Sequence, residues 1–441
     1  MLPLLLHLLA LPISNAQQSR PDGDSSSPKL WALLVAGSNE WYNYRHQADI
    51  CHAYQILHKH GVPDDRIVVM MYDDIAYNKE NIWKGKIINH PKGKDVYKGV
   101  PKDYTGKHVT PKNFRSILLG LKEEMRGIGS EKVIDSGPND HIFVNFVDHG
   151  AHGILSFPTT EMTVGELNET LWLMRERNRY GKMLIYVEAC ESGSMFHSTL
   201  PRDIEIYATT AANGQESSYA CFFDETLKTY LGDCYSVNWM EDSDRANLEE
   251  ETIEQQFKVV KKETNTSHVK QYGDLSVAEL PLSEFFGNKL LLGASPKYTM
   301  GKFWSQDAVS SRDVPLEILK RRMAHNSPDG RIVAFQYRHL LQKREYFHNF
   351  FKKLVLTMVD GSDVDPLLLF ERQDISMTQL DCHTKMVHSF SELCFNFGKN
   401  PYAMKYAYVF VNICEQQLPV EKMLEKMRTV CSGEKRYRNI L

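Results

Sequence analysis

Short apolar runs alternate with amphipathic stretches along the first 290 residues of the chain. Residues 142–147 and 183–187 are rich in β-branched and aromatic side chains and predict buried strands. Residues 31–36, 67–72 and 204–209 predict three further strands. Apolar side chains fill most positions of these runs, which is typical of strands covered on both faces.

The stretches between these runs have the spacing of amphipathic helices. Residues 46–60 place apolar side chains on one face and end before Gly61, and residues 112–125 and 164–177 predict two more helices. Residues 73–111, rich in Gly, Pro, Lys and Asn, predict a long loop. This alternation of strands and helices favours an α/β fold with a mainly parallel sheet flanked by helices.

The later part of the chain has a different pattern. Residues 281–330 contain many Pro and Gly residues and few periodic segments, so they predict a linker. Apolar spacing near 3.6 returns in residues 335–359 and 402–413 and predicts an all-helical domain. The domain boundaries that follow are 29–290 for the α/β domain, 291–326 for the linker and 327–441 for the helical domain.

The N-terminus predicts export from the cytosol. Residues 1–16 contain an apolar core, and Ser14 and Ala16 are small residues before the expected cut of a signal peptide. Residues 17–28 predict a disordered leader, and no other apolar run reaches the ~18 residues of a membrane span. In a secreted chain, the triplets that begin at Asn168 and Asn265 predict glycosylation.

Charge and cysteine content narrow the function classes. Hydrophobic residues make up 42% of the chain and charged residues 24%, values typical of a globular protein, and without a long basic run nothing favours nucleic acid. Residues 327–441 have a net charge of +3 and the remainder −7, which either indicates docking of one part on the other or is compositional scatter. Four of the eight cysteines fall in the last 60 residues and predict two disulfides.

Reactive side chains follow two of the predicted strands. His149 comes after residues 142–147, and Cys190 comes after residues 183–187. Because parallel strands present their carboxyl ends at one edge of a sheet, we expect an imidazole beside a thiol, the pair that makes a thiolate nucleophile. Gly150 leaves room for a substrate carbonyl, and the N–H groups of Gly150 and Cys190 could form an oxyanion hole.

Two other chemistries use the same segments. His149, His152 and Cys190 could be zinc ligands, but His-x-x-His is an uncommon metal spacing and no Glu-bearing helix motif accompanies it. Ser192 could be a nucleophile, but the Gly-x-Ser-x-Gly pattern is absent. The sequence therefore favours a cysteine nucleophile, with no metal and no cofactor.

Longer blocks of sequence carry a family resemblance. They are residues 38–49, 69–77, 99–106, 186–195, 207–213, 216–221 and 233–244. These blocks resemble legumain, the asparaginyl endopeptidase family, over nearly the whole mature chain, the four-cysteine tail included. The resemblance implies a caspase-like α/β domain followed by an all-α prodomain. It also implies a lysosomal cysteine endopeptidase that cuts after Asn and, at lower pH, after Asp.

The resemblance also implies roles for individual residues. Cys190 and His149 match the catalytic dyad, and Asn43 matches the residue that orients the histidine. The walls of the P1 pocket are matched by Arg45, His46, Glu188, Ser217, Ser218 and Asp233. A carboxamide needs both donors and acceptors, which a pocket of Arg with Glu and Asp supplies. Protonation of these acids would weaken the repulsion of a P1 Asp.

The prodomain is expected to make the enzyme a zymogen that acid activates autocatalytically. By the family pattern its disulfides are Cys382–Cys414 and Cys394–Cys431, and the domain caps the active-site cleft. Asn326 is the expected cut site in the activation linker, and Asp313 is a second one at acid pH. The resemblance further implies cystatin-type inhibitors and a secretory route to the lysosome or endosome, with secretion of the proenzyme as another outcome.

The chain departs from the family at three places, one of which is the loop of residues 212–216, which differs from mammalian members and faces the non-prime side in the family. Legumains often carry Trp where Cys234 follows the pocket residue Asp233. Residues 119–121 read Leu-Gly-Leu where mammalian members carry Arg-Gly-Asp, so that tripeptide supports no integrin binding.

Three rival functions share the fold or the chemistry. A glycolipid-anchor transamidase would end in a membrane span, and a substrate-binding decoy would lack His149, Cys190 or Asn43. Peptide ligation uses the same thioester as hydrolysis and is a side activity that the sequence leaves open.

Overall fold

The computed structural model describes residues 28–288, 307–324, 330–373 and 375–432. The expected signal peptide and nearly all of the expected leader lie outside the described residues. Among the residues that are described, no helix combines the length and the hydrophobicity needed to cross a membrane.

A six-stranded sheet lies at the centre of the first domain, in the order β11-β8-β7-β3-β1-β2. Its members are β1 (Leu30–Ala36), β2 (Ile67–Met70), β3 (His141–Val147), β7 (Lys182–Glu188), β8 (Ile206–Thr210) and β11 (Lys270–Gly273). All neighbouring pairs are parallel except β11 and β8. The expected mainly parallel sheet is thereby confirmed.

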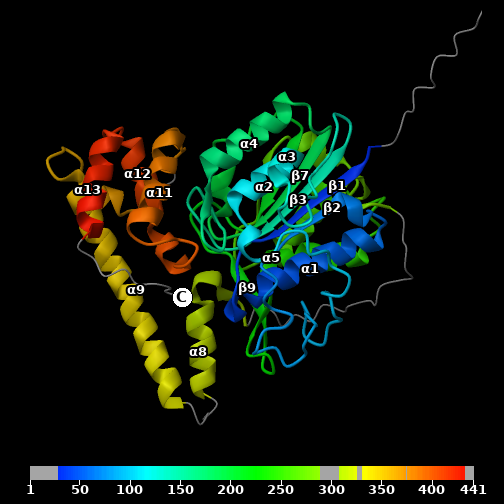
Figure 1. The fold of residues 1–441 in the computed structure, drawn as a ribbon, viewed down its shortest axis with the longest axis horizontal. Coiled ribbons are helices and arrows are strands. Elements are labelled where there is room, and N and C mark those ends of the chain that lie inside the picture. The colour runs from blue at the N-terminus through cyan, green and yellow to red at the C-terminus, as the bar shows by residue number, and fades with distance from the viewer. Residues whose placement is uncertain (1–27, 289–306, 325–329, 374, 433–441) are drawn as a thin grey trace, which may run out of the picture.

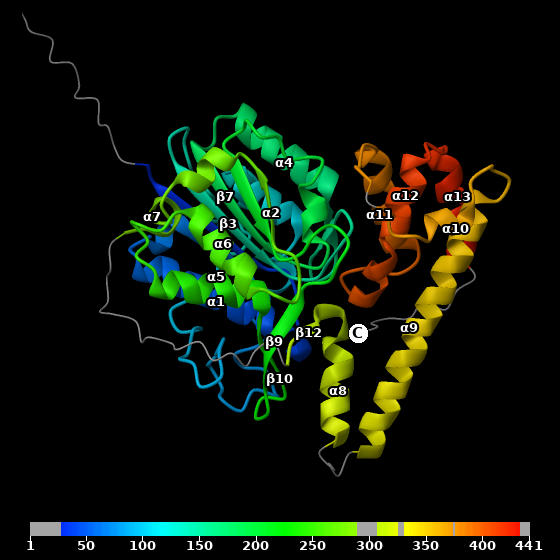
Figure 2. The same ribbon diagram turned by 180° about the vertical axis from the view of Figure 1, so that it is seen from behind.

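Helices cover both faces of this sheet, as Figures 1 and 2 show from opposite sides. One face carries α1 (Tyr44–Lys59), α5 (Cys234–Arg245), α6 (Ile253–Glu263) and α7 (Ser283–Phe286), and the other carries α2 (Pro111–Leu118), α3 (Lys122–Met125) and α4 (Val164–Glu176). Each layer encloses its own apolar cluster, so β3 is buried along its whole length.

The single helix expected over residues 112–125 is wrong. The chain forms α2 and then α3, and Gly120 lies between them with φ +69°. A Cβ at Gly120 would lie 2.8 Å from the carbonyl oxygen of Ile134, so the close approach and the left-handed conformation both require glycine.

Two small antiparallel sheets were not foreseen. One contains β4 (Gly150–Ala151), β5 (Ile154–Ser156) and β6 (Glu161–Thr163). The other contains β9 (Tyr219–Asp224), β10 (Thr229–Asp233) and β12 (Val309–Ser310). Both extend from the carboxyl ends of the central strands and shape the edge where the candidate site lies.

The C-terminal domain is all-helical, as expected. It contains α9 (Gly330–Val359), α10 (Pro366–Leu369), α11 (Leu380–Leu393), α12 (Tyr408–Glu415) and α13 (Val420–Ser432). Aromatic side chains form much of its core, among them Phe347, Phe351 and Phe390. Cys382 is bonded to Cys414 and Cys394 to Cys431, which are the pairs that the family resemblance implies.

The linker expected over residues 281–330 is wrong in its second half, where residues 314–324 form α8 (Val314–Ala324). Pro315 lies in the first turn, where a missing N–H is tolerated. Val314 and Ile318, four residues apart, pack with Ala220 and Tyr230. Leu316 and Leu319 pack against the core of the helical domain, so α8 has an apolar contact on each side.

The helical domain rests on the α/β domain through α11, which packs on α4 and β6. His388 lies 3.3 Å from Glu161 and 3.0 Å from Glu166. These two carboxylates raise the pKa of His388 to about 10. His383 is buried against Gly153, where burial lowers its pKa to about 3. The interface therefore contains one charged and one neutral histidine.

Candidate active site

His149 and Cys190 come from neighbouring strands of the sheet. Val147 at the end of β3 is paired with Glu188 at the end of β7, and the two reactive residues follow within two positions. Both side chains are buried and line one small enclosed space. The structure therefore brings together the imidazole and the thiol that the strand ends predict.

The ring of His149 is held by Asn43. Nε2 of His149 lies 2.9 Å from Oδ1 of Asn43, and Nδ2 of Asn43 donates to the carbonyl oxygen of Asn39 at 3.0 Å. The second bond orients the amide so that Oδ1 accepts from the ring. His149 then carries its proton on Nε2, and Nδ1 is the nitrogen that can accept a proton from a thiol.

Burial, together with the positive charges of Arg45 and Arg312, holds the pKa of His149 well below its ordinary value. The imidazole is therefore neutral, which is the form that acts as a general base.

Cys190 lies at a tight turn. The next residue, Glu191, has φ 54°, and Sγ of Cys190 lies 3.7 Å from Oγ of Ser218. A Cβ at Gly150 would lie 2.5 Å from the carbonyl oxygen of Cys190, so only glycine lets the two strand ends approach this closely. Gly150 thus allows the contact that places His149 beside Cys190.

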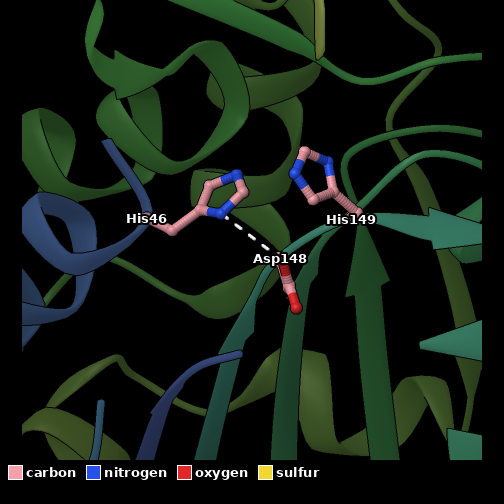
Figure 3. Close-up of side chains that lie close together, drawn as sticks. All are labelled: His46, Asp148 and His149. Carbon is pink, nitrogen blue, oxygen red and sulfur yellow. Dashed lines mark ion pairs between the residues drawn. The ribbon is translucent and has the colours of Figure 1, made fainter. Parts of the chain in front are cut away.

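A second histidine, His46, lies beside His149, as Figure 3 shows. Nδ1 of His46 is 2.6 Å from Oγ of Ser38 and 3.5 Å from Oδ1 of Asp148, and the rings of His46 and His149 meet edge to face at 5.0 Å. Burial lowers the pKa of His46 and raises that of Asp148, in each case well away from its ordinary value.

One ligand atom from each of His46, Asp148 and His149 lies within 4.8 Å of the others, so this trio could accept a cation when Asp148 is ionised. The zinc set weighed from the sequence is a different one. His152, one of its members, forms a hydrogen bond of 2.8 Å with the carbonyl oxygen of Gly214 through Nδ1.

The expected pocket residues form a buried charged group. Arg45 donates from Nε to Oδ1 of Asp233 at 2.8 Å and from Nη1 to the carbonyl oxygen of Tyr42 at 3.0 Å. Glu188 accepts at Oε2 from the N–H and the hydroxyl of Ser236. Nη2 of Arg45, Oε1 of Glu188 and Oδ2 of Asp233 are buried without a hydrogen bond to the described residues. The group therefore offers one donor and two acceptors.

The two carboxylates of this group resist ionisation. Burial and the neighbouring charge of Asp233 raise the pKa of Glu188 well above its ordinary value. Burial also raises the pKa of Asp233, although Arg45 opposes that shift. Asp49, which the sequence reading did not single out, accepts from the N–H of Asp233 at 3.3 Å, and burial together with the charges of Asp233 and Glu188 raises its own pKa well above the ordinary value.

The chain's own residues 309–313 cover the cleft. β12 pairs with β9, and the N–H of Ser311 donates to the carbonyl oxygen of Ser218 at 2.9 Å. Arg312 donates to Glu191 at 2.6 Å, to the carbonyl oxygen of Gly150 at 3.1 Å and to Oγ of Ser217 at 3.3 Å. The side chain of Arg312 thus occupies the space beside Cys190 that a substrate would need.

Two arginines of the helical domain contact this segment or the carboxylate that it binds. Arg344 donates to the carboxylate of Asp313 and to the carbonyl oxygen of Arg312, and Nη1 of Arg372 lies 3.0 Å from Glu191. Arg312 and Arg372 lower the pKa of Glu191 although burial opposes them. These long-range contacts were not predictable, because no local spacing in the sequence links residue 191 to residues 312 and 372.

The remaining expected sites are placed as follows. The Asp313 side chain is half exposed and paired with Arg344, and Asn326 lies outside the described residues. Asn265 is exposed in the turn after α6, and Asn168 is partly exposed on α4.

The fold and this pair of residues, covered by a helical C-terminal domain, define the class of a cysteine endopeptidase with its own prodomain. Comparisons with known proteins agree. Residues 30–289 match the Peptidase C13 family, and residues 336–431 match the legumain prodomain. The chain belongs to the Peptidase C13 family and, within it, to the legumains.

Curated relatives extend over nearly the whole chain. Legumain of Rattus norvegicus is 49% identical over 93% of this chain and 94% of its own. Hemoglobinase of Schistosoma japonicum is 40% identical over 97% and 98%, and the vacuolar-processing enzyme delta-isozyme of Arabidopsis thaliana is 40% identical over 92% and 91%. A solved caspase-1 structure from Spodoptera frugiperda overlaps 60% of this chain and 93% of its own at a TM-score of 0.36 and 12% identity.

Proposed function

We propose that this cysteine endopeptidase cuts peptide bonds after Asn and, at acid pH, after Asp. The observation that carries the proposal is the free buried donor and acceptors of Arg45, Glu188 and Asp233. A P1 carboxamide offers a carbonyl oxygen to the guanidinium and an NH₂ group to the carboxylates, so it satisfies both kinds of atom. His46, Ser217 and Ser218 complete the proposed pocket.

The proposed reaction begins at Cys190. Nδ1 of His149 takes the thiol proton, and the thiolate attacks the carbonyl carbon after the P1 residue. The N–H groups of Gly150 and Cys190 stabilise the oxyanion, as proposed from their position at the strand ends. His149 then gives its proton to the leaving amine, and a thioester remains. Water hydrolyses the thioester and regenerates the thiol.

The preference for P1 Asp at acid pH follows from the pocket carboxylates. Their pKa values are raised, so Glu188 and Asp233 take up protons at a higher pH than exposed carboxylates do. A less negative pocket repels a P1 Asp less. An amine that attacks the thioester in place of water would give ligation, which we keep as a side activity.

The proenzyme is proposed to be inactive until acid releases its prodomain. Arg312 and Ser311 fill the cleft, Arg344 donates to the carbonyl oxygen of Arg312, and Arg372 shares the Glu191 carboxylate with Arg312. We propose that the enzyme itself then cuts at Asn326, between α8 and α9 in the chain, with Asp313 as a second site at low pH. Pro328 falls at P2′ of the Asn326 cut and therefore does not block it.

The cellular setting is proposed from the sequence. A signal peptide over residues 1–16 and glycans on Asn168 and Asn265 fit a secretory route to the lysosome. The proposed partners are protein substrates with P1 Asn or Asp, cystatin-type inhibitors and the chain's own prodomain.

The test uses reporter peptides that differ only at P1. Acid-treated protein is incubated with Asn, Asp and Lys reporters between pH 4 and pH 7, and we expect cleavage of Asn throughout and of Asp only toward the acid end. Equal cleavage of the Lys reporter would contradict the pocket assignment.

The matched variant for this test is Cys190→Ala, which should fold and lose at least about 10⁴-fold in activity. Trimming of Cys190→Ala protein at Asn326 as fast as wild type, in the same purified buffer, would rule out self-processing. The buried Cys51→Ala variant is the control, because Cys51 contacts Met71 and not the cleft.

A further inference from the structure

Two cysteines outside the catalytic pair lie together behind the wall of the cleft. Cys221 is in the middle of β9, and Cys234 directly follows β10 and begins α5. Both are buried in the same apolar cluster, with 0% and 4% of their surface exposed. Both have free thiols in the part of the chain that the structure describes.

The strand pairing places the two side chains on one face. Cys221 lies opposite Gly232 in the ladder, and Cys234 is two residues beyond Gly232. Such diagonal neighbours lie ~7–8 Å apart in a regular ladder, slightly beyond the ~6.8 Å between Cα atoms that a disulfide spans. The chain leaves the ladder at Cys234, however, and the two thiols lie close enough for Cys234 to contribute to the raised pKa of Cys221.

The rest of the chain indicates that it folds where disulfides form. Cys382–Cys414 and Cys394–Cys431 are already bonded in the helical domain. We propose that Cys221 and Cys234 form a third disulfide, which ties β9 to the start of α5.

The oxidant is a disulfide of the secretory pathway, such as glutathione disulfide or an oxidised disulfide isomerase. One cysteine attacks it and forms a mixed disulfide, and the second cysteine displaces the carrier thiol. Two electrons and two protons pass to the oxidant, which leaves as two thiols.

This bond forms while the chain folds. Burial and the neighbouring thiol raise the pKa of Cys221 well above its ordinary value, so in the folded protein it is a protonated and poor nucleophile. Exchange is therefore fast only before the hairpin of β9 and β10 packs against α5. Once closed, the bond is shielded from reductants for the same reason.

The proposed bond between Cys221 and Cys234 lies next to residues of the proposed substrate pocket. Ser217 and Ser218 immediately precede β9, and Asp233 immediately precedes Cys234. A bond between Cys221 and Cys234 fixes the separation of these two sides of the proposed pocket. The inference goes beyond the proposed specificity, because the bond can exist whichever P1 residue the pocket accepts.

Thiol labelling of the full-length protein tests the proposal directly. Protein secreted from eukaryotic cells is unfolded in guanidinium with N-ethylmaleimide, digested without reduction and mapped by mass spectrometry. We expect the label on Cys51 and Cys190 and a linked peptide pair that contains Cys221 and Cys234. Label on both Cys221 and Cys234 in most molecules, or a link from either one to Cys190, would overturn the proposal.

Single variants give a second readout. Cys221→Ser and Cys234→Ser should each raise the number of labelled cysteines from two to three, because each frees the other partner. Cys51→Ser is the matched control and should lower the number to one. An unchanged label on Cys234 in the Cys221→Ser protein would contradict the pairing even if the wild-type map were incomplete.

Discussion

Nη2 of Arg312 lies 2.6 Å from Oε1 of Glu191, the residue next to Cys190. The contact joins the linker to the cleft, and Arg372 of the helical domain supports it at 3.0 Å from Oε2 of the same carboxylate. Two parts of the chain far from Glu191 in sequence thus balance one buried charge. This balance connects the state of the prodomain to the access of a substrate.

Removing one of these cations should loosen the binding of residues 309–313 in the active-site cleft. In Arg312→Ala the Glu191 carboxylate keeps Arg372 but loses its closest partner, and breaking a buried pair costs about 3–5 kcal/mol when no partner remains. With Arg372 in place we expect a smaller effect, on the order of a 10- to 100-fold increase in the labelling rate of Cys190 by a peptidyl thiol reagent at pH 7.

The control for this prediction is Lys320→Ala. Lys320 lies on α8 and pairs only at the surface with Glu317, among the described residues. Equal labelling rates in wild type, Arg312→Ala and Lys320→Ala would show that Arg312 does not close the cleft.

Acid should weaken the docking of the prodomain on the α/β domain through His383. Docking keeps this histidine neutral with a pKa of about 3, whereas a released histidine titrates near 6.5. Released prodomain therefore binds the proton better, and docking stability is lost as pH falls from about 6.5 toward 3, by up to about 1.4 kcal/mol per unit. His152, His388 and Glu166 face this group. None of these three residues is changed in the variant His383→Gln, which tests the role of His383.

The variant His383→Gln should therefore move the midpoint of prodomain release to lower pH, by about one unit. Hydrogen exchange at β6 and α4, corrected for its intrinsic pH dependence, measures the release in Cys190→Ala protein. A midpoint equal to that of the parent protein would contradict the role of His383.

His388→Gln provides the opposite control. The pKa of His388 is raised to about 10, so its contribution is fully present below about 6.5 and is lost only as pH rises toward 10. Removing it should weaken docking to a similar extent from pH 5 to pH 6.5, which moves the acid midpoint to higher pH, opposite to the effect of His383→Gln. The carboxylates act in the direction that the sequence suggests, because the lowered pKa values of Glu166 and Glu191 mean that stability is lost as acid protonates them.

The orientation of His149 should depend on Asn43. In Asn43→Ala, Nε2 of His149 loses its partner, so the ring can rotate or carry its proton on the wrong nitrogen. We expect kcat to fall by about 10- to 10³-fold with little change in KM, and the pH profile to shift.

Asn39→Ala is the matched control for Asn43, because Asn39 contributes only its backbone carbonyl oxygen to this contact. Equal losses of activity in the two variants would indicate a structural effect on η1 (Trp41–Asn43), the short helix that carries Asn43, rather than positioning of the ring.

The two disulfides of the helical domain should increase its free energy of unfolding. Cys394 and Cys431 are 37 residues apart, and a loop of this length is worth roughly 3–4 kcal/mol in the loop-entropy account. The double variant Cys394→Ala and Cys431→Ala should lower the unfolding free energy of the prodomain by about this amount in guanidinium titrations. No change in the midpoint would contradict it.

The strands that carry the site were predictable because each is a local signal. Residues 142–147 and 183–187 are apolar at nearly every position, and the reactive residue follows the run directly. Parallel pairing then places His149 and Cys190 at one edge, which requires only the general rule for such sheets.

Other parts were not predictable from local patterns. The Pro- and Gly-rich composition around Pro315 predicted a linker in place of α8. The apolar residues of this helix are buried by packing against Ala220 and Tyr230, which are distant in sequence. Nothing in the local sequence distinguishes Arg312 from other arginines. Its contact with Glu191 forms only because β12 pairs with β9. Contacts of this kind depend on the tertiary fold and leave no periodic trace in the sequence.

The two-sided packing of α8 has a consequence for activation. A cut between α8 and α9 turns the helical domain into a separate molecule, whose hold on the cleft then weakens on dilution. Residues 309–324 stay covalently joined to the α/β domain and keep an effective concentration in the millimolar range for a short tether. The inhibitory segment should therefore outlast the prodomain in the cleft, and full activity should follow its own removal, independently of protein concentration.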